Sequence, residues 1–123
     1  MRDKQTVVVL GASPKPERYA NRAILMLKAA GHHVVPVHPK LETIEGLPVI
    51  HQLKDIHDAV DTLTLYVGPT RLQPMIEDIV ALRPARVIFN PGTESKALQN
   101  RLEEAGIPYL KACTLVMLQT RQF

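Results

Sequence analysis

Short apolar runs alternate with longer segments of helical periodicity along most of this chain of 123 residues. The runs are rich in Val, Leu, Ile and Tyr, carry few charges, and fall at 6–10, 33–37, 62–67, 86–89 and 108–110. Strands of this kind are typical of a parallel sheet that helices cover on both faces. The alternation therefore predicts an α/β fold, a Rossmann-like doubly wound parallel sheet of about five strands in three layers.

Three segments show the three- and four-residue spacing of apolar positions that helices packed on a sheet require, at about 19–30, 70–82 and 95–105. Gly31 supplies the left-handed exit from the first helix. Thr70 is the expected N-cap of the second helix, and Pro84 follows its end. Residues 38–61 form a connector that is expected to hold no more than one short helix, within 51–60.

Composition limits the organisation of the chain and its partners. A chain of 123 residues with 46% hydrophobic residues supports one core, so residues 1–123 are expected to form a single domain. The formal net charge of +3 favours an anionic ligand only weakly, because the charges are scattered. With no Trp, 3 Tyr and 2 Phe, and no basic stripe, the chain lacks the features of a nucleic-acid reader.

The sequence also bears on the compartment. Residues 1–5 lack the apolar core of a secretion signal, and no apolar run is long enough to cross a bilayer. The single cysteine, Cys113, cannot form an internal disulfide, which agrees with a reducing compartment. A cytoplasmic protein without membrane attachment is therefore expected, and a protein partner and the oligomeric state are left open.

Loop-forming residues follow four of the predicted strands, at 11–16, 38–40, 68–70 and 90–93. The carboxyl ends of parallel strands meet at one edge of a sheet, where ligands gather. Gly11, Gly68 and Gly92 allow a ligand to approach bare backbone, and the helix that follows Gly11-Ala12-Ser13 offers unpaired N–H groups to a phosphate. With charges from Lys15, Arg18 and Lys40 nearby, this edge is predicted to bind a phosphorylated nucleotide.

The residues after the second predicted strand narrow the choice of nucleotide. A protein that binds NAD usually places a carboxylate there to accept from the ribose 2′-hydroxyl. Here the strand ends in His38-Pro39-Lys40, and a cation suits a phosphate on the adenosine ribose instead. Coenzyme A carries such a phosphate at the 3′ position and NADP carries one at the 2′ position, so both ligands are compatible with this turn.

Several short motifs, taken together and in order, resemble those of the stand-alone CoA-binding domain proteins: Gly11-Ala12-Ser13, His38-Pro39, Gly46-Leu47-Pro48-Val49, Asn90-Pro91-Gly92-Thr93-Glu94, and Ala105-Gly106-Ile107 followed by Ala112-Cys113. The chain is thereby similar to the CoA-binding domain of the succinyl-CoA synthetase α subunit. It departs from its relatives at Ala20, where they often have Ser, and at Ser95, where they often have Asn. The synthetase's phosphohistidine and its nucleotide-grasping domain have no counterpart, so the ligase reaction is not carried over.

The resemblance implies that coenzyme A or an acyl-CoA is the cofactor. It implies that the Gly11 to Ser13 turn lies near the phosphates, that Pro39 and Lys40 lie beside the 3′-phosphate end, and that 66–69 and 90–92 follow the crevice. Combined with the loop residues above, it gives the predicted ligand-binding set of Gly11, Ala12, Ser13, Lys15, Arg18, His38, Pro39, Lys40, Val67, Gly68, Pro69, Asn90, Pro91 and Gly92.

No catalytic or metal-binding residue is expected. The five histidines form no pair at metal-binding spacing, and no nucleophile elbow or phosphate-binding Walker loop is present. His38 and Cys113 are the nearest to reactive groups, and Cys113 is more simply a small core residue than a partner for the thiol of CoA. The preferred hypothesis is a non-catalytic CoA or acyl-CoA binding protein; the alternatives are an NADP-binding redox-responsive module or small enzyme using His38 or Cys113, and a pure interaction protein.

Overall fold

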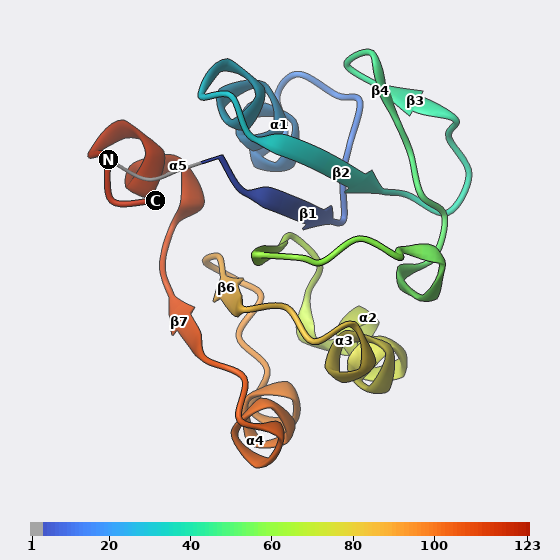
Figure 1. Cartoon of the computed structure of the whole chain (residues 1–123), viewed down its shortest axis with the longest axis vertical. Coiled ribbons are helices and arrows are strands. Elements are labelled where there is room, and N and C mark those ends of the chain that lie inside the picture. The colour runs from blue at the N-terminus through green and yellow to red at the C-terminus, as the bar shows by residue number, and fades with distance from the viewer. Residues whose placement is uncertain (1–3) are drawn as a thin grey trace.

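The structure, a computed structural model, describes residues 4–123 and confirms the predicted fold class. A sheet of five strands in the order β2-β1-β5-β6-β7 runs through the middle of the molecule (Figure 1). All four pairs of neighbouring strands are parallel. The strands are β1 (Thr6–Leu10), β2 (His33–Val37), β5 (Thr62–Leu65), β6 (Arg86–Phe89) and β7 (Tyr109–Lys111).

Helices cover both faces of this sheet (Figure 1). Val7 and Val9 of β1 face α1 (Tyr19–Ala29) and α5 (Thr114–Gln119) in one apolar cluster. Val8 and Leu10 face the opposite cluster, which is built with α2 (Pro69–Leu72), α3 (Ile76–Leu82) and α4 (Lys96–Ala105). Because successive side chains of a strand point to opposite faces, β1 is apolar at every one of these positions. Within residues 4–123, no helix has the length and apolar character that a membrane span requires.

The strand order reverses between β1 and β5. The chain leaves β1 through α1 to reach β2 on one side, and later returns to form β5 on the other side of β1. Connections that diverge in this way leave a crevice beyond the carboxyl ends of the two strands, and ligands of doubly wound sheets bind there. The fold therefore places the predicted ligand-binding edge at its topological switch point.

The predicted helix at 70–82 is wrong in its start and its continuity. The N-cap is Gly68 and not Thr70, and Pro69 occupies the first helical position, which suits a residue without an N–H group. A 3₁₀ turn, η2 (Gln73–Met75), then separates α2 from α3. Pro74 cannot donate the next helical hydrogen bond, so the chain tightens there before it resumes as α3.

The connector also differs from the prediction. It contains a hairpin of β3 (Thr43–Ile44) and β4 (Leu47–Pro48), which pair antiparallel as a separate small sheet. Its two turn residues, Glu45 and Gly46, have φ values of 51° and 76°, as a tight hairpin turn requires. The short helix expected within 51–60 is a single 3₁₀ turn, η1 (Leu53–Asp55).

Smaller differences concern element ends. The strand predicted at 62–67 ends at Leu65, so Tyr66 and Val67 leave the sheet and are available to the switch point. The strand predicted at 108–110 is shifted by one residue, to 109–111. The third helix begins at Lys96 because Ser95 is its N-cap.

Candidate functional site

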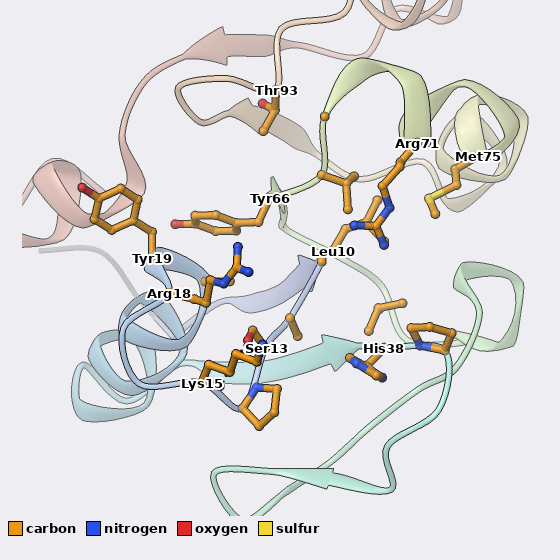
Figure 2. A pocket seen from close by; sticks show the side chains of 18 of the residues that line it. Leu10, Ser13, Lys15, Arg18, Tyr19, His38, Tyr66, Arg71, Met75 and Thr93 are labelled. Carbon is orange, nitrogen blue, oxygen red and sulfur yellow. Dashed lines mark hydrogen bonds between the residues drawn. The ribbon is translucent and has the colours of Figure 1, made fainter.

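A cavity of about 750 Å³ lies at the switch point, beyond the carboxyl ends of β1, β2, β5 and β6. Its walls come from the loops that follow these strands and from the first turns of α1 and α2 (Figure 2). Four segments that are far apart in the sequence therefore meet around one volume, which is large enough for a nucleotide-sized ligand.

Most of the predicted ligand-binding residues line this cavity: Gly11, Ala12, Ser13, Lys15, Arg18, His38, Pro39, Val67, Gly68, Pro91 and Gly92. Three of the predicted residues, Lys40, Pro69 and Asn90, are not part of its lining. Lys40 and Pro69 are exposed beside it, whereas Asn90 is buried behind it. Whether any of these residues contacts a ligand remains a prediction.

Gly11 has a specific steric role at the floor of the cavity. Its φ of 91° lies in the region that side chains disfavour, and a Cβ built there would lie 2.8 Å from the backbone oxygen of Tyr66. The closeness arises because Tyr66 N–H donates to the Leu10 oxygen, which joins the ends of β1 and β5. Only glycine permits both the turn and this approach.

Hydrogen bonds from α1 hold the loop after β1 in place. Asn21 of α1 is fully buried, and its Nδ2 donates to the Ser13 carbonyl at 3.0 Å and to Glu45 Oε2 at 2.9 Å. Lys28 Nζ donates to the Glu45 carbonyl at 2.7 Å, so the β3–β4 hairpin is fastened to the same helix. Within the loop, Lys15 N–H donates to Ser13 Oγ at 3.1 Å. The loop therefore has a defined conformation before any ligand arrives.

Within the described residues 4–123, no anionic side chain caps the N-terminus of α1. Arg18 is the N-cap residue, it makes no side-chain capping hydrogen bond, and the first turn contains no acidic residue. A helix N-terminus carries a partial positive charge and unpaired N–H groups, which bind anions well. Here that charge is reinforced by Arg18 and by Lys15 in the preceding loop.

Among residues 4–123, the charged groups that line the cavity are all basic. Lys15, Arg18 and Arg71 contribute to its walls, together with two histidines, and no Asp or Glu of the described chain does so. Within residues 4–123, none of these three cations takes part in an ion pair. Because the whole chain has 12 acidic against 15 basic residues, such a one-sided lining is a local feature of this cavity. It favours an anionic ligand.

Two histidines at the rim of the cavity form hydrogen bonds with backbone atoms of Leu41. His38 Nδ1 accepts from the N–H groups of Lys40 and Leu41, at 3.1 and 3.2 Å. On the other side, His51 Nε2 lies 3.1 Å from the Leu41 carbonyl and 3.5 Å from Glu42 Oε2. With Nδ1 of His38 used as an acceptor, the proton of its neutral ring is on Nε2.

Asn90 has a structural role behind the cavity wall. Its Nδ2 donates to Thr64 Oγ1 and the Leu65 carbonyl, at 2.7 and 2.8 Å, and its Oδ1 accepts from Thr114 N–H at 2.8 Å. These contacts are buried and join β5, β6 and the start of α5, so they occupy both ends of the amide. Burial raises the pKa of Tyr66, which covers this region, to about 12.

Several lining residues were not predicted, chiefly Tyr19, Leu41, His51, Arg71, Met75 and Thr93. Arg71 had a usable signal: it stands in the first helical turn after a predicted strand, where side chains reach the ligand edge. No sequence signal pointed to His51, because the isolated bridge between Val37 and Ile50 brings it to the cavity. Met75 is half-buried, packs against the apolar core and also lines the cavity wall.

A doubly wound parallel sheet with a cationic cavity at its switch point is typical of the Rossmann-like class of α/β domains. Residues 5–119 match the family model described as a CoA binding domain, and the chain therefore belongs to that family. The resemblance seen in the sequence motifs is confirmed.

Similar proteins share the fold over nearly the whole chain. A crystal structure of an uncharacterized protein is 39% identical, with a TM-score of 0.93, and the match covers 99% of this chain and 100% of that one. The cell-free ID.343 protein of Thermus thermophilus is 30% identical, with a TM-score of 0.89 and coverage of 98% and 91%. The curated protein YneT of Bacillus subtilis is 21% identical over 100 residues, which are 81% of this chain and 74% of YneT.

A larger enzyme contains the same fold as one part of its chain. The dinucleotide-forming acetyl-coenzyme A synthetase 1 of Ca. Korarchaeum cryptofilum, solved with phosphate and ADP, matches with a TM-score of 0.76 and 19% identity. The match covers 89% of this chain but only 26% of the synthetase chain. At this identity the likeness concerns the fold alone.

Proposed function

We propose that this protein binds coenzyme A or an acyl-CoA in the switch-point cavity and does not itself catalyse a reaction. The observation that carries the proposal is the set of Lys15, Arg18 and Arg71 around a cavity that no carboxylate of residues 4–123 lines, in a chain of the CoA-binding domain family. The diphosphate would lie at the N-terminus of α1, where N–H groups and two cations compensate its charge.

The non-catalytic part of the proposal is supported by the surroundings of the reactive side chains. His38 is oriented by backbone N–H groups of its own turn and by no carboxylate, unlike the imidazole of an acid/base pair. Cys113 is half-buried at the start of α5 and is not part of the cavity lining. We therefore expect acetyl-CoA to remain intact when it is incubated with the protein.

Calorimetric titration with CoA, acetyl-CoA, NADP and NAD tests the proposal directly. We expect CoA or acetyl-CoA to bind more tightly than either dinucleotide, and NAD to bind weakest because it lacks a phosphate on the adenosine ribose. Native mass spectrometry of protein purified without added ligand gives an independent readout, since a co-purified ligand is identified by its mass. Tighter binding of NAD than of CoA would contradict the proposal.

The second candidate is a redox-responsive NADP module or a small NADP-dependent enzyme. It is favoured by the same observation that argues against NAD, namely a turn of His38, Pro39 and Lys40 after β2 in place of a carboxylate. Tighter binding of NADP than of CoA, together with turnover that His38→Ala or Cys113→Ser abolishes, would establish this candidate in place of the first.

A further inference from the structure

Cationic groups enter the cavity from two sides. Figure 2 shows Lys15 and Arg18 on the side of Ser13 and Tyr19, and the guanidinium of Arg71 pointing from α2 toward the side where His38 lies. A ligand with one anionic group would need only the first side, where the N-terminus of α1 also lies. The cationic group on the second side, Arg71, is therefore not needed to bind a diphosphate.

The hydrogen-bonding state of His38 adds to this second side. Its Nδ1 is occupied by the N–H groups of Lys40 and Leu41, so Nε2–H is the ring group left for a ligand. Within residues 4–123, Nε2 of His38 has no hydrogen-bond partner. The turn thus leaves Nε2–H as a donor at the cavity wall, where an acceptor such as a phosphate oxygen would pair with it.

Arg71 supplies donors and charge to the same side. Its guanidinium has five N–H donors in a planar fork that matches phosphate geometry. The side chain is exposed and makes no ion pair within residues 4–123, so no internal contact has to break before it binds an anion. Lys40, which the resemblance implied for this role, is not part of the lining, and its backbone N–H is used by His38.

We propose that Arg71 and His38 form a separate subsite for a phosphate monoester on the adenosine ribose, distinct from the diphosphate region at Lys15 and Arg18. This inference rests on the proposed function and makes it more specific: the subsite distinguishes ligands that carry a ribose phosphate from otherwise identical ligands that lack it. CoA and NADP share this chemistry, and dephospho-CoA and NAD lack it.

The test compares CoA with dephospho-CoA, which differ only in the 3′-phosphate. Wild-type protein is expected to bind CoA about 10- to 100-fold more tightly, as charge-assisted hydrogen bonds to a phosphate predict. Arg71→Gln is expected to bring that ratio close to one while the affinity for dephospho-CoA changes by less than about twofold. Lys54→Gln is the matched control, because it removes an exposed cation outside both the cavity lining and the predicted ligand-binding set and should preserve the ratio. Lys40→Gln tests the placement of the phosphate that the resemblance implied.

His38 is tested by a variant that preserves its turn. In His38→Asn, the side-chain oxygen replaces Nδ1 as acceptor of the turn N–H groups, but the Nε2–H donor is lost. We expect CoA to bind about 5- to 10-fold more weakly and dephospho-CoA to bind as before. ¹⁵N NMR of the histidine rings should show the Nε2–H tautomer for His38 in the wild-type protein.

The outcomes separate this inference from the proposed function. If wild-type protein binds neither CoA nor dephospho-CoA, the proposed function fails, and the same comparison with NADP and NAD decides whether a dinucleotide uses the subsite. If CoA binds but Arg71→Gln weakens CoA and dephospho-CoA equally, or leaves their ratio unchanged, the phosphate monoester subsite is not at Arg71. A loss of the ratio in Lys40→Gln, or an Nδ1–H tautomer of His38, would likewise overturn it.

Discussion

The junctions β1–α1 and β6–α4 occupy equivalent positions in the fold but differ in how the N-terminus of the helix is capped. Both lead from the carboxyl end of a strand into a helix at the ligand edge. At β1–α1 the helix has no side-chain cap, and the exposed Arg18 stands at its N-terminus. At β6–α4, Ser95 Oγ accepts from Leu98 N–H at 3.1 Å, which caps the helix internally.

Other polar groups of the β6–α4 loop also form hydrogen bonds within the loop. Thr93 N–H and Thr93 Oγ1 both donate to the Asn90 carbonyl, at 3.0 and 2.7 Å, and Gly92 N–H donates to Glu94 Oε1 at 3.1 Å. The N–H groups of Gly92 and Thr93 are therefore already hydrogen-bonded within the loop, although Pro91, Gly92 and Thr93 form part of the cavity wall. We therefore expect an anion at the β1–α1 junction, whose helix has no side-chain cap, and not at the β6–α4 junction, where Ser95 caps the helix.

Removing the side-chain amide of Asn90 should give the largest effect, a loss of folding stability. Asn90→Ala leaves Thr64, the Leu65 carbonyl and Thr114 N–H without their buried partner. We expect the free energy of unfolding to fall by about 3–5 kcal/mol, measured by urea denaturation. Asn100→Ala, an exposed position of α4, is the control and should change it by less than about 0.5 kcal/mol. A loss as small as that of the control would mean that the amide is not structural.

Adding a methyl group to Gly11 should destabilise the β1–α1 junction. Gly11→Ala combines an unfavourable φ of 91° with a Cβ 2.8 Å from the Tyr66 oxygen. We expect a loss of about 2–4 kcal/mol in the free energy of unfolding, together with weaker CoA binding. Gly31→Ala is a close control, because it has a φ of 89° and open space around its Cβ. Equal losses in the two variants would show that the contact with Tyr66 costs nothing.

Giving α1 a side-chain cap should weaken the binding of an anionic ligand at the β1–α1 junction. Arg18→Asp places a carboxylate at an N-cap position with extended backbone, φ −80° and ψ 142°. CoA affinity should fall by about 100-fold, since a cation is replaced by an anion, and the helix should gain up to about 1 kcal/mol. Arg18→Gln separates the two effects, with about a tenfold loss of affinity and little change in stability. Unchanged CoA affinity in Arg18→Asp would place the phosphates elsewhere.

Removing the cap of α4 should give the smallest effect. Ser95→Ala loses the hydrogen bond to Leu98 N–H and should lower the free energy of unfolding by about 1 kcal/mol without altering CoA affinity by more than about twofold. Ser95→Asp restores an acceptor and should recover most of the loss. A fall in CoA affinity that exceeds the fall in stability would show that this junction also contacts the ligand.

Local sequence patterns predicted much of the fold and part of the site. The first helix was placed correctly because Ala20, Ala23, Ile24 and Leu27 repeat on one side, and all four are buried. The second helix was misplaced because Thr70 looks like a cap, whereas the proline at position 69 and the one at 74 determine the start and the break. Asn90 was predicted to contact the ligand from its place after a strand. Its side chain joins β5, β6 and α5, and a ligand contact by this residue stays a prediction.

The sequence by itself predicted the class of fold, which the structure confirms, and a turn of His38, Pro39 and Lys40 that favours a phosphate on the ribose, which remains a prediction. These predictions follow from periodicity and turn chemistry, which act over a few residues. Only the tertiary structure decided that His51 reaches the cavity, that Asn21 joins the loop at Ser13 to Glu45 of the hairpin, and that Lys40 stays outside the cavity lining. Those placements depend on which distant segments the sheet brings together, and side-chain contacts across such separations leave no periodic trace in the chain.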